Sequence, residues 1–469
     1  MMDKVLPQNM SSLVEGYRTG EFTPLDALGA TLELVDAVNP SINAMAMVDA
    51  DGARAAAAES TSRWASGNAL SSLDGVPVTI KDSVNAVGMP WRHGSAAHTN
   101  VPDAEVDSPP AARLKEAGAV IVGKTTMPDF GMMAAGVSSL YGIVRNPWDL
   151  SRNTGGSSAG AGASLAAGIG YAAVGTDIAG SVRLPAGHCG LVALKPTQGR
   201  IPHLPSSMMR SPGPMARTVD EAIAMYRAIA RPDRRDAWSL PAESIEESQW
   251  EADVRGLRIG VMTDMGYGYE ADAAVVAVVD AAAQVFAVAG AKVTRVTPPF
   301  DSDPYAPLDR LFQVRARAEW ESIPEERRGE VIGAVSAWAE PASFASATDY
   351  SRDLEAVNAA QMRIQRHLEP YDFVISPVIP VVGFAADTVG LDPERPLAHC
   401  SFTAWFNQTG QPASTLCFGM LEGCPVGVQI VGSRFADTDV LAMTKWLEDR
   451  RRFDMNWPDL ALGVSGGAR

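Results

Sequence analysis

Two segments rich in glycine and serine constrain this chain more than any other feature of its sequence. Residues 154–160 read TGGSSAG and residues 175–185 read GTDIAGSVRLP, with an apolar stretch of small residues between them. Small residues let backbone N–H groups approach a ligand closely, and consecutive N–H groups in such a turn can hold an anion. A serine at the end of such a turn is suited to attack a carbonyl carbon while those amides hold the oxyanion. Taken alone, however, turns of this composition are more often only turns.

Patterns typical of strands and helices alternate along the chain. Val76, Val78 and Ile80 alternate as in a strand that ends at Lys81, and Thr218 begins a capping-box pattern. Further strands are expected at 119–122, 169–175, 256–262, 291–297, 373–377 and 426–431, and helices at 23–38, 50–65, 111–117, 218–230 and 271–289. This order predicts an α/β fold, a single large domain with a mixed, mostly parallel central sheet covered by helices on both faces.

Composition excludes several classes of function. The 469 residues carry 39 Lys and Arg against 55 Asp and Glu, a net charge of -16, so nucleic-acid binding is not expected. Four cysteines are no disulfide framework, and no Cys-x-x-Cys or His-Glu-x-x-His pattern indicates a metal site. The first residues lack a signal peptide, and residues 159–175 are too short and too weakly apolar to span a bilayer. We therefore expect a cytoplasmic protein without membrane contact.

Two short motif matches compete with an interpretation based on the serines. Residues 118–125 read GAVIVGKT and match a phosphate-loop pattern, but the central residues AVIV are expected to form a strand that cannot wrap phosphate. Residues 156–160, GSSAG, match a nucleophile elbow around Ser158. An elbow needs an apolar strand before it, and residues 146–154 are polar. Because histidines follow later in the chain, the elbow stays open as an alternative.

The two Gly/Ser segments also resemble the hallmark of the amidase signature family of serine hydrolases. That hallmark is a run of the form G-G-S-S-G-G, then small residues, then G-T-D-x-G-G-S-x-R-x-P. The resemblance extends over about residues 10–450 and includes residues 73–82 (LDGVPVTIKD), 118–131 (GAVIVGKTTMPDFG), 146–148 (NPW), 407–412 (NQTGQP) and 425–432 (PVGVQIVG). It implies the amidase signature fold for residues 1–469, with a catalytic core at about 70–220, a surface excursion at about 231–250 and a pocket-forming, closing part at about 255–455.

The resemblance implies a role for each matched residue. Ser181 is expected to be the nucleophile that forms the acyl-enzyme, Ser157 the bridging serine after a cis peptide bond, and Lys81 the base. A protonated lysine is a poor base at pH 7, but desolvation lowers the pKa of a buried lysine. A neutral Lys81 can then take a proton from Ser157, which takes one from Ser181, and the relay later returns a proton to the leaving amine.

The turn around the nucleophile supplies the remaining predicted roles. Backbone N–H groups of Ile178, Ala179 and Gly180, with that of Ser181, are expected to form the oxyanion hole. Ala179 stands where the family has glycine, as does Ala159, so a positive φ at residue 179 would strain the turn. Three polar residues, Thr176, Asp177 and Arg183, are expected to support the turn, although Arg183 could instead meet an acidic substrate.

The substrate is the least determined part of the prediction. Gly131, Met132 and Trp405 are expected to line an apolar or aromatic pocket. We therefore expect hydrolysis of a small non-peptide amide, or of an ester, carbamate or hydrazide, without cofactor or metal and with a homodimer as one possible state. Two alternatives remain: the glutaminase subunit of a tRNA-dependent amidotransferase, and a non-catalytic scaffold on the same fold.

Overall fold

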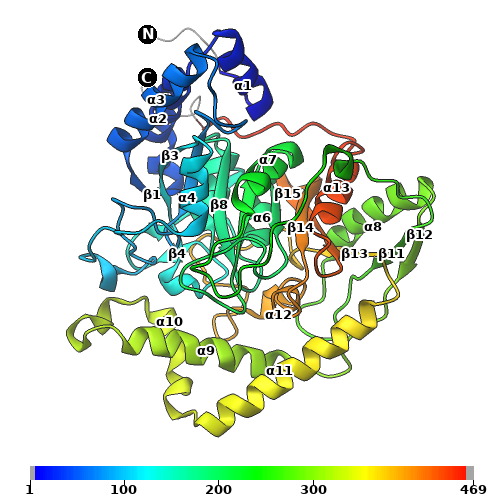
Figure 1. Cartoon of the computed structure of the whole chain (residues 1–469). Coiled ribbons are helices and arrows are strands. Elements are labelled where there is room, and N and C mark those ends of the chain that lie inside the picture. The colour runs from blue at the N-terminus through cyan, green and yellow to red at the C-terminus, as the bar shows by residue number, and fades with distance from the viewer. Residues whose placement is uncertain (1–5, 461–469) are drawn as a thin grey trace, which may run out of the picture.

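An eleven-stranded sheet runs across the whole molecule in this computed structural model, which describes residues 6–460 (Figure 1). The strand order is β1-β3-β2-β8-β10-β9-β14-β15-β13-β11-β12. Its strands are β1 (Met45–Val48), β2 (Pro77–Lys81), β3 (Val120–Thr125), β8 (Ala172–Asp177), β9 (Val192–Lys195), β10 (Ser211–Ala216), β11 (Arg258–Val261), β12 (Lys292–Arg295), β13 (Phe373–Pro377), β14 (Ala413–Leu421) and β15 (Cys424–Gly432). Two small ladders pair β4 (Val137–Ser138) with β5 (Gly142–Ile143) and β6 (Arg145–Asn146) with β7 (Asp149–Asn153).

The sheet is mixed, as predicted, but the expectation of mostly parallel pairing was wrong. Strand β2 pairs in parallel with β3 and β8, and β11 does so with β12 and β13. The other six pairings in the described sheet are antiparallel. The difference arises at the centre, where β10 returns between β8 and β9 and where β14 and β15 form a hairpin. Neither β10 nor β14 was expected from the sequence.

Helices cover both faces of the sheet, as the sequence predicted. They are α1 (Met10–Thr19), α2 (Pro24–Ile42), α3 (Ala50–Ala65), α4 (Pro109–Glu116), α5 (Ala159–Ala166), α6 (Arg183–Cys189), α7 (Val219–Ile229), α8 (Ala273–Val288), α9 (Tyr305–Glu321), α10 (Gly333–Ala339), α11 (Ala347–Leu368), α12 (Trp405–Gln408) and α13 (Asp437–Glu448). Helices α7 and α13 pack together over the middle strands, and α5 and α6 pack together against the sheet. Because both faces are covered, every residue of β2, including its last, Lys81, is buried.

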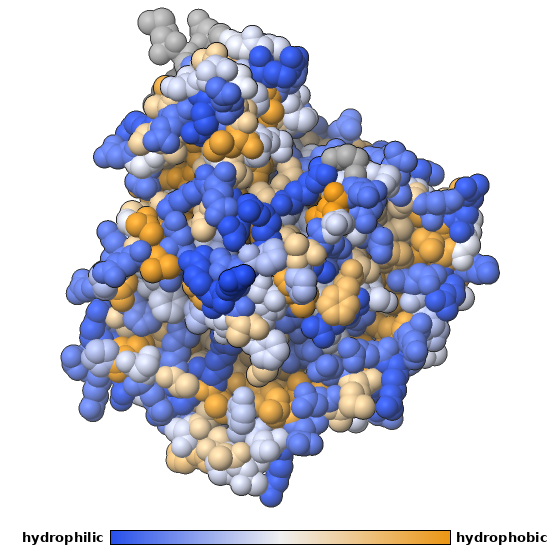
Figure 2. Space-filling model, viewed as in Figure 1, coloured by the Kyte–Doolittle hydropathy of each residue, from blue (hydrophilic) through white to orange (hydrophobic). Residues whose placement is uncertain are grey.

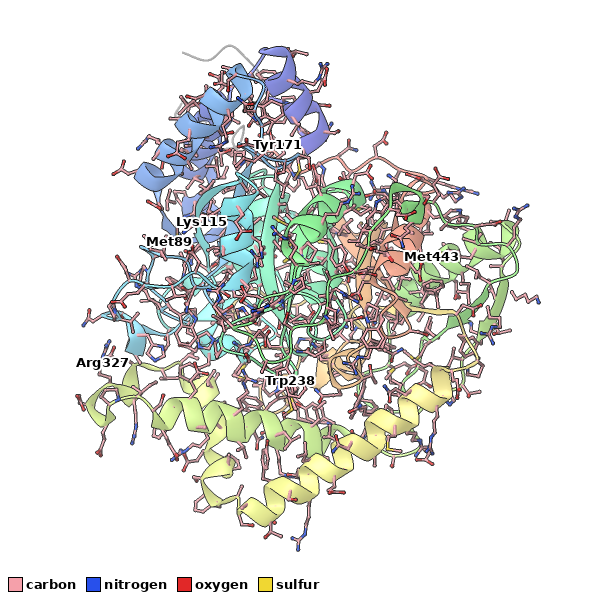
Figure 3. The ribbon with its side chains drawn as sticks, viewed as in Figure 1. Met89, Lys115, Tyr171, Trp238, Arg327 and Met443 are labelled. Carbon is pink, nitrogen blue, oxygen red and sulfur yellow. The ribbon has the colours of Figure 1, made fainter. Side chains whose placement is uncertain are left out.

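A layer formed by α9, α10 and α11 lies along one edge of the sheet, at the bottom of Figure 1. Leu308, Trp338 and Ile364 of this layer share an apolar core with Trp405 of α12. Arg327, labelled in Figure 3, donates a hydrogen bond to Ala96 O at 2.8 Å and so fastens the layer to the segment before α4. The layer is therefore tied to the rest of the molecule by apolar packing and by hydrogen bonds.

Most predicted elements are present, with shifted ends. Helix α3 has the predicted bounds, and Thr218 forms the capping box of α7 with Glu221. The phosphate-loop look-alike is the buried strand β3, as expected. The predicted end of α2 at residue 38 was wrong, because the helix continues through Pro40 to Ile42. A proline removes one backbone donor, and so close to the helix end few bonds depend on it.

The proposed division of the chain into a core, an excursion and a closing part stays a prediction. The predicted domain spans residues 1–469, and residues 1–5 and 461–469 lie outside the described residues. Residues 231–246 contain no helix or strand, and Trp238 in this segment is labelled in Figure 3. Hydrophilic side chains cover most of the face drawn in Figure 2, with scattered hydrophobic groups between them. None of the helices described is long and apolar enough to cross a membrane.

Candidate active site

The carboxyl ends of β2 and β8 bring the predicted site residues to one edge of the sheet. The two strands are parallel, with Ile80 opposite Val174, so Lys81 and Asp177 end at the same side. Strand β10 runs antiparallel to β8 and starts at Ser211, opposite Asp177. The end of β2, the turn after β8 and the residues just before β10 therefore lie together at this edge.

Lys81 is 1% exposed and its amine is surrounded by oxygen atoms. Its Nζ lies 2.7 Å from Ser157 Oγ, 3.0 Å from Thr176 Oγ1 and 3.3 Å from Thr176 O. Ser83, which the sequence did not suggest, places its Oγ 3.2 Å from Thr176 Oγ1. Burial, and next the positive charge of Arg210, hold the pKa of Lys81 well below its ordinary value.

The first Gly/Ser turn holds Ser157 against this amine. The Gly156–Ser157 peptide bond is cis, as the family resemblance implied. A Cβ on Gly156 would lie 2.5 Å from Ala135 O, so only glycine fits at this position. The next residue, Ser158, is fully buried, and its N–H donates to Ser181 O at 3.1 Å. That bond joins the two Gly/Ser turns.

The hydroxyl of Ser158 is occupied by backbone groups. Its Oγ donates to Thr176 O at 3.3 Å and accepts from Thr176 N at 3.4 Å. Among the described residues, no histidine forms a hydrogen bond with this hydroxyl. The elbow interpretation therefore lacks its base, and Ser158 is a structural link between the turns.

The second turn is held by the carboxylate of Asp177. This carboxylate accepts hydrogen bonds from Gly180 N at 2.7 Å and Val182 N at 3.2 Å, and pairs with Arg183 at 2.9 and 3.0 Å. Burial alone would raise the pKa of Asp177, but the charge of Arg183 and these bonds lower it to about 2. The carboxylate therefore stays charged and fixes the turn.

These bonds correct the predicted oxyanion hole at one position. The Gly180 N–H already donates to Asp177, so it is not free to bind a substrate oxygen. Within residues 6–460, no hydrogen bond occupies the N–H groups of Ile178, Ala179 or Ser181. The positive φ of the turn, 126°, falls on Gly180 rather than on Ala179, so the alanine there causes no strain.

Arg183 is fully buried and its guanidinium is saturated with acceptors. Besides Asp177 it donates to Thr403 O at 2.9 Å, Gln429 Oε1 at 2.8 Å and Asn407 Oδ1 at 2.7 Å. No donor of this side chain is left for a substrate. Its contacts tie the turn that contains Ser181 to the C-terminal part of the chain.

Two small adjoining cavities lie beside the serines, each with a volume of about 10 Å³. They share Gly131, Met132 and Ile178 as lining residues. The cavity at Ser181 is otherwise mainly apolar and is lined by Met133, Ala134, Ala179, Leu184, Phe312, Leu397 and Cys400. The cavity at Lys81 and Ser157 is more polar and is lined also by Ser83, His93, Met127, Phe130, Thr176 and Arg210.

The third predicted pocket residue, Trp405, lies deeper. It is fully buried, its indole N–H donates to Tyr267 Oη at 2.6 Å, and it is not among the residues that line these two cavities. Phe312, Leu397 and Arg210 were not suggested by the sequence. Each belongs to a segment far along the chain that the fold returns to this edge, and no local pattern marks them.

Comparisons with known proteins agree on one family. A family model described as Amidase matches residues 26–441. The chain is 33% identical to an acylamidase from Rhodococcus erythropolis, over 92% of this chain and 93% of that protein. It is 34% identical to one of the subunits of glutamyl-tRNA(Gln) amidotransferase from Roseiflexus castenholzii, over 90% and 91%. The structure of a bacterial aryl acylamidase of the amidase signature family superposes with a TM-score of 0.89 at 25% identity, covering 97% and 98%.

Proposed function

The chain belongs to the amidase signature family, and from this premise we propose that it hydrolyses the C–N bond of a small non-peptide amide with an apolar acyl group, through an acyl-enzyme on Ser181. Esters, carbamates and hydrazides with such an acyl group are further candidate substrates of the same chemistry. The observation that carries the proposal is the buried contact of 2.7 Å between Lys81 Nζ and Ser157 Oγ.

The surroundings of Lys81 suit an uncharged amine. A neutral amine has two N–H groups and one lone pair, and three oxygen atoms surround Nζ. The carbonyl oxygen of Thr176 can only accept, so one N–H points to it and the other to Thr176 Oγ1. The lone pair is then left for the hydroxyl of Ser157, which lies nearest. This is the arrangement that a base needs.

The first half of the reaction runs from substrate to lysine. Ser181 Oγ forms a bond to the carbonyl carbon and gives its proton to Ser157, whose own proton passes to Lys81. The carbonyl oxygen becomes negative, and the N–H groups of Ile178, Ala179 and Ser181, which make no other hydrogen bond among the described residues, are the proposed donors to it.

The second half runs back along the same path. The ammonium of Lys81 returns a proton to Ser157, and Ser157 protonates the nitrogen as the C–N bond breaks, so the amine leaves neutral. Water then attacks the acyl-enzyme with the same relay as base, and the carboxylic acid is released with Ser181 restored. The apolar lining at Ser181, with Leu184, Phe312 and Leu397, supports an apolar acyl group in this cavity.

Similarity to amidotransferase subunits favours a second candidate function. Under it, the chain would release ammonia from glutamine as part of a complex. Glutamine is zwitterionic, whereas the lining of the cavity at Ser181 is mainly apolar, which is why we place this candidate second.

Hydrolysis by the purified single chain distinguishes the two candidates. We expect turnover of hexanoyl anilide and of simple hexanamides, complete loss in Ser181→Ala, and no release of ammonia from glutamine. Ammonia release from glutamine without turnover of any apolar amide would support the second candidate and contradict the first. Full activity in Ser181→Ala would contradict both.

A further inference from the structure

Arg210 is a buried cation with no bonding partner beside the proposed reacting atoms. It precedes β10, is 8% exposed, and lines the cavity that also contains Lys81 and Ser157. Within the described part of the chain its guanidinium forms no hydrogen bond and no ion pair. A charged side chain removed from bulk water is normally paired, because an unpaired one costs free energy. An unpaired guanidinium facing a cavity therefore points to a ligand that pairs with it.

A second arginine adds to the positive charge at this place. Phe312, Arg315 and Glu319 are spaced at three and four residues along α9, so they share one face of the helix. Phe312 lines the cavity at Ser181, and Glu319 contacts the ring Nδ1 of His93, which lines the cavity at Lys81. Arg315 lies between them, and its guanidinium likewise has no hydrogen bond or ion pair among residues 6–460. This face of α9 therefore covers the site.

The local charges do not cancel. Burial and then the nearby Arg315 lower the pKa of Arg210 to about 10, so Arg210 stays protonated at neutral pH. Glu319 is the carboxylate that acts on both arginines, and it already contacts His93. Two guanidinium groups thus face one carboxylate, and the cavity keeps an excess of positive charge.

The position of this charge relative to the serines decides which half of a substrate it meets. Ser157 must protonate the leaving nitrogen, so the leaving amine lies on the side of Ser157 and Lys81. Arg210 lines that same cavity, whereas the apolar cavity lies at Ser181. A planar guanidinium fork matches a carboxylate with two parallel hydrogen bonds.

We propose that the preferred substrate is an amide whose amine half carries a carboxylate, as in an N-acyl amino acid, with that carboxylate bound by Arg210 in the field of Arg315. The apolar acyl half lies in the cavity lined by Leu184, Phe312 and Leu397. This substrate class rests on the proposed amidase function. It gives Arg210, which the sequence analysis did not identify, a role in substrate specificity.

Three matched amides test the proposal. N-hexanoylglycine carries the acid on the amine half, N-isobutylhexanamide is its uncharged isostere, and N-isobutyladipamate carries the acid on the acyl half. We expect kcat/KM for N-hexanoylglycine to exceed that for the uncharged isostere by about tenfold or more, the usual value of a charge-assisted pair. In Arg210→Met this ratio falls to about one or below, and in Arg210→Lys it is intermediate. The control is Arg255→Met, which removes an exposed arginine that pairs with Asp253 and keeps the ratio.

Three results of these kinetics overturn the proposal. The first is a ratio near one in the wild-type protein, and the second is a ratio that Arg210→Met leaves unchanged. The third is a preference for N-isobutyladipamate that depends on Arg210, which would move the acid to the acyl half. Far-UV circular dichroism and a melting curve of both Arg210 variants establish that each is folded before its kinetics are compared.

Binding separates a failure of this proposal from a failure of the proposed function. Titration calorimetry of Ser181→Ala with N-hexanoylglycine measures affinity without turnover. We expect affinity that falls by about tenfold or more when Arg210→Met is added. If the wild-type protein hydrolyses no amide but this binding depends on Arg210, the proposed reaction is wrong and the carboxylate-binding site at Arg210 is supported. If amides are hydrolysed but neither binding nor the kinetic ratio depends on Arg210, the reaction is supported and the carboxylate-binding site is wrong.

Discussion

Two buried arginines lie near the turn that contains Ser181, and they differ in their hydrogen bonds. Arg183 forms five hydrogen bonds and is fully buried, while the guanidinium of Arg210 forms none within residues 6–460 and is 8% exposed. The difference teaches that burial of a charge does not identify its role, whereas an account of its hydrogen bonds does. The guanidinium of Arg183, with all its hydrogen bonds formed, stabilises the fold, and that of Arg210, which forms none, is proposed to bind a ligand.

Lys81 extends this comparison to a buried amine whose pKa is held well below its ordinary value, and its removal has the largest expected effect. Lys81→Met should lower kcat/KM by about 10²–10⁴-fold, the usual contribution of a positioned base. Steady-state kinetics with N-hexanoylglycine and its uncharged isostere measure the loss, which should be equal for both. Lys445→Met, which removes a lysine paired with Asp220 away from the site, is the control and should keep the activity.

Arg183→Met should cause the largest loss of stability. It leaves the carboxylate of Asp177 buried without its partner, which typically costs about 3–5 kcal/mol. Denaturant unfolding of the variant, with Arg255→Met as the control, measures this change in the free energy of unfolding. Loss of less than about 1 kcal/mol would mean that the network around Asp177 does not stabilise the fold as we describe.

Arg210→Met should behave in the opposite way in the same experiment. Its guanidinium has no partner to leave behind, and its removal takes away a desolvated charge, so the free energy of unfolding should change by less than about 1 kcal/mol or increase. A loss comparable to that of Arg183→Met would contradict the contrast between the two arginines. It would indicate an unrecognised structural role for Arg210.

The smallest expected effect is a shift of the pH profile. Activity requires neutral Lys81 and should rise with pH through its lowered pKa. Arg210 is the second cause of that lowered pKa after burial, so Arg210→Met should raise the pKa and move the acidic limb of the profile to higher pH. The profile is measured as kcat/KM on N-isobutylhexanamide, which has no carboxylate. An unmoved limb in Arg210→Met would show that this charge does not act on Lys81.

The free energy of unfolding should also depend on the protonation of Lys81, and the direction of its change with pH follows from the lowered pKa. Between the lowered pKa of Lys81 and its ordinary value near 10.5, the unfolded chain binds a proton that the folded protein does not. The contribution of Lys81 to stability therefore rises with pH in this window. Lys81→Met should unfold less readily than the wild-type protein at pH 7, and the difference should shrink as pH rises toward 10. Unfolding curves at several pH values test this expectation.

The sequence identified the residues that meet at the site better than it predicted the shape of the cavities there. Lys81, Ser157 and Ser181 each stand in a segment with a recognisable pattern, so both Gly/Ser turns and the strand before Lys81 were identified. Strand β10 was missed because Pro212 and Pro214 argue against a central strand, and it pairs with β9 only over Met215 and Ala216. Arg210 was missed with it, because an isolated arginine before an unrecognised strand has no signature.

The error at Gly180 has a related origin. Glycine in such a turn suggests a free N–H near a ligand, and its positive φ is indeed required there. Which N–H groups remain free, however, depends on the carboxylate of Asp177, and spacing alone does not reveal where that side chain points. Phe312, which lines the cavity at Ser181, lies on α9, a helix that was not predicted from the sequence.

Covalent labelling tests the relay through Lys81 most directly. An alkyl fluorophosphonate is reacted with the wild-type protein and with Lys81→Met over a range of pH, and the modified residue is identified by mass spectrometry. The account predicts labelling at Ser181 alone, at a rate that falls with acid as Lys81 gains a proton and that is lost in Lys81→Met. Labelling of Ser158, or an equal rate of labelling at Ser181 in Lys81→Met, would contradict it.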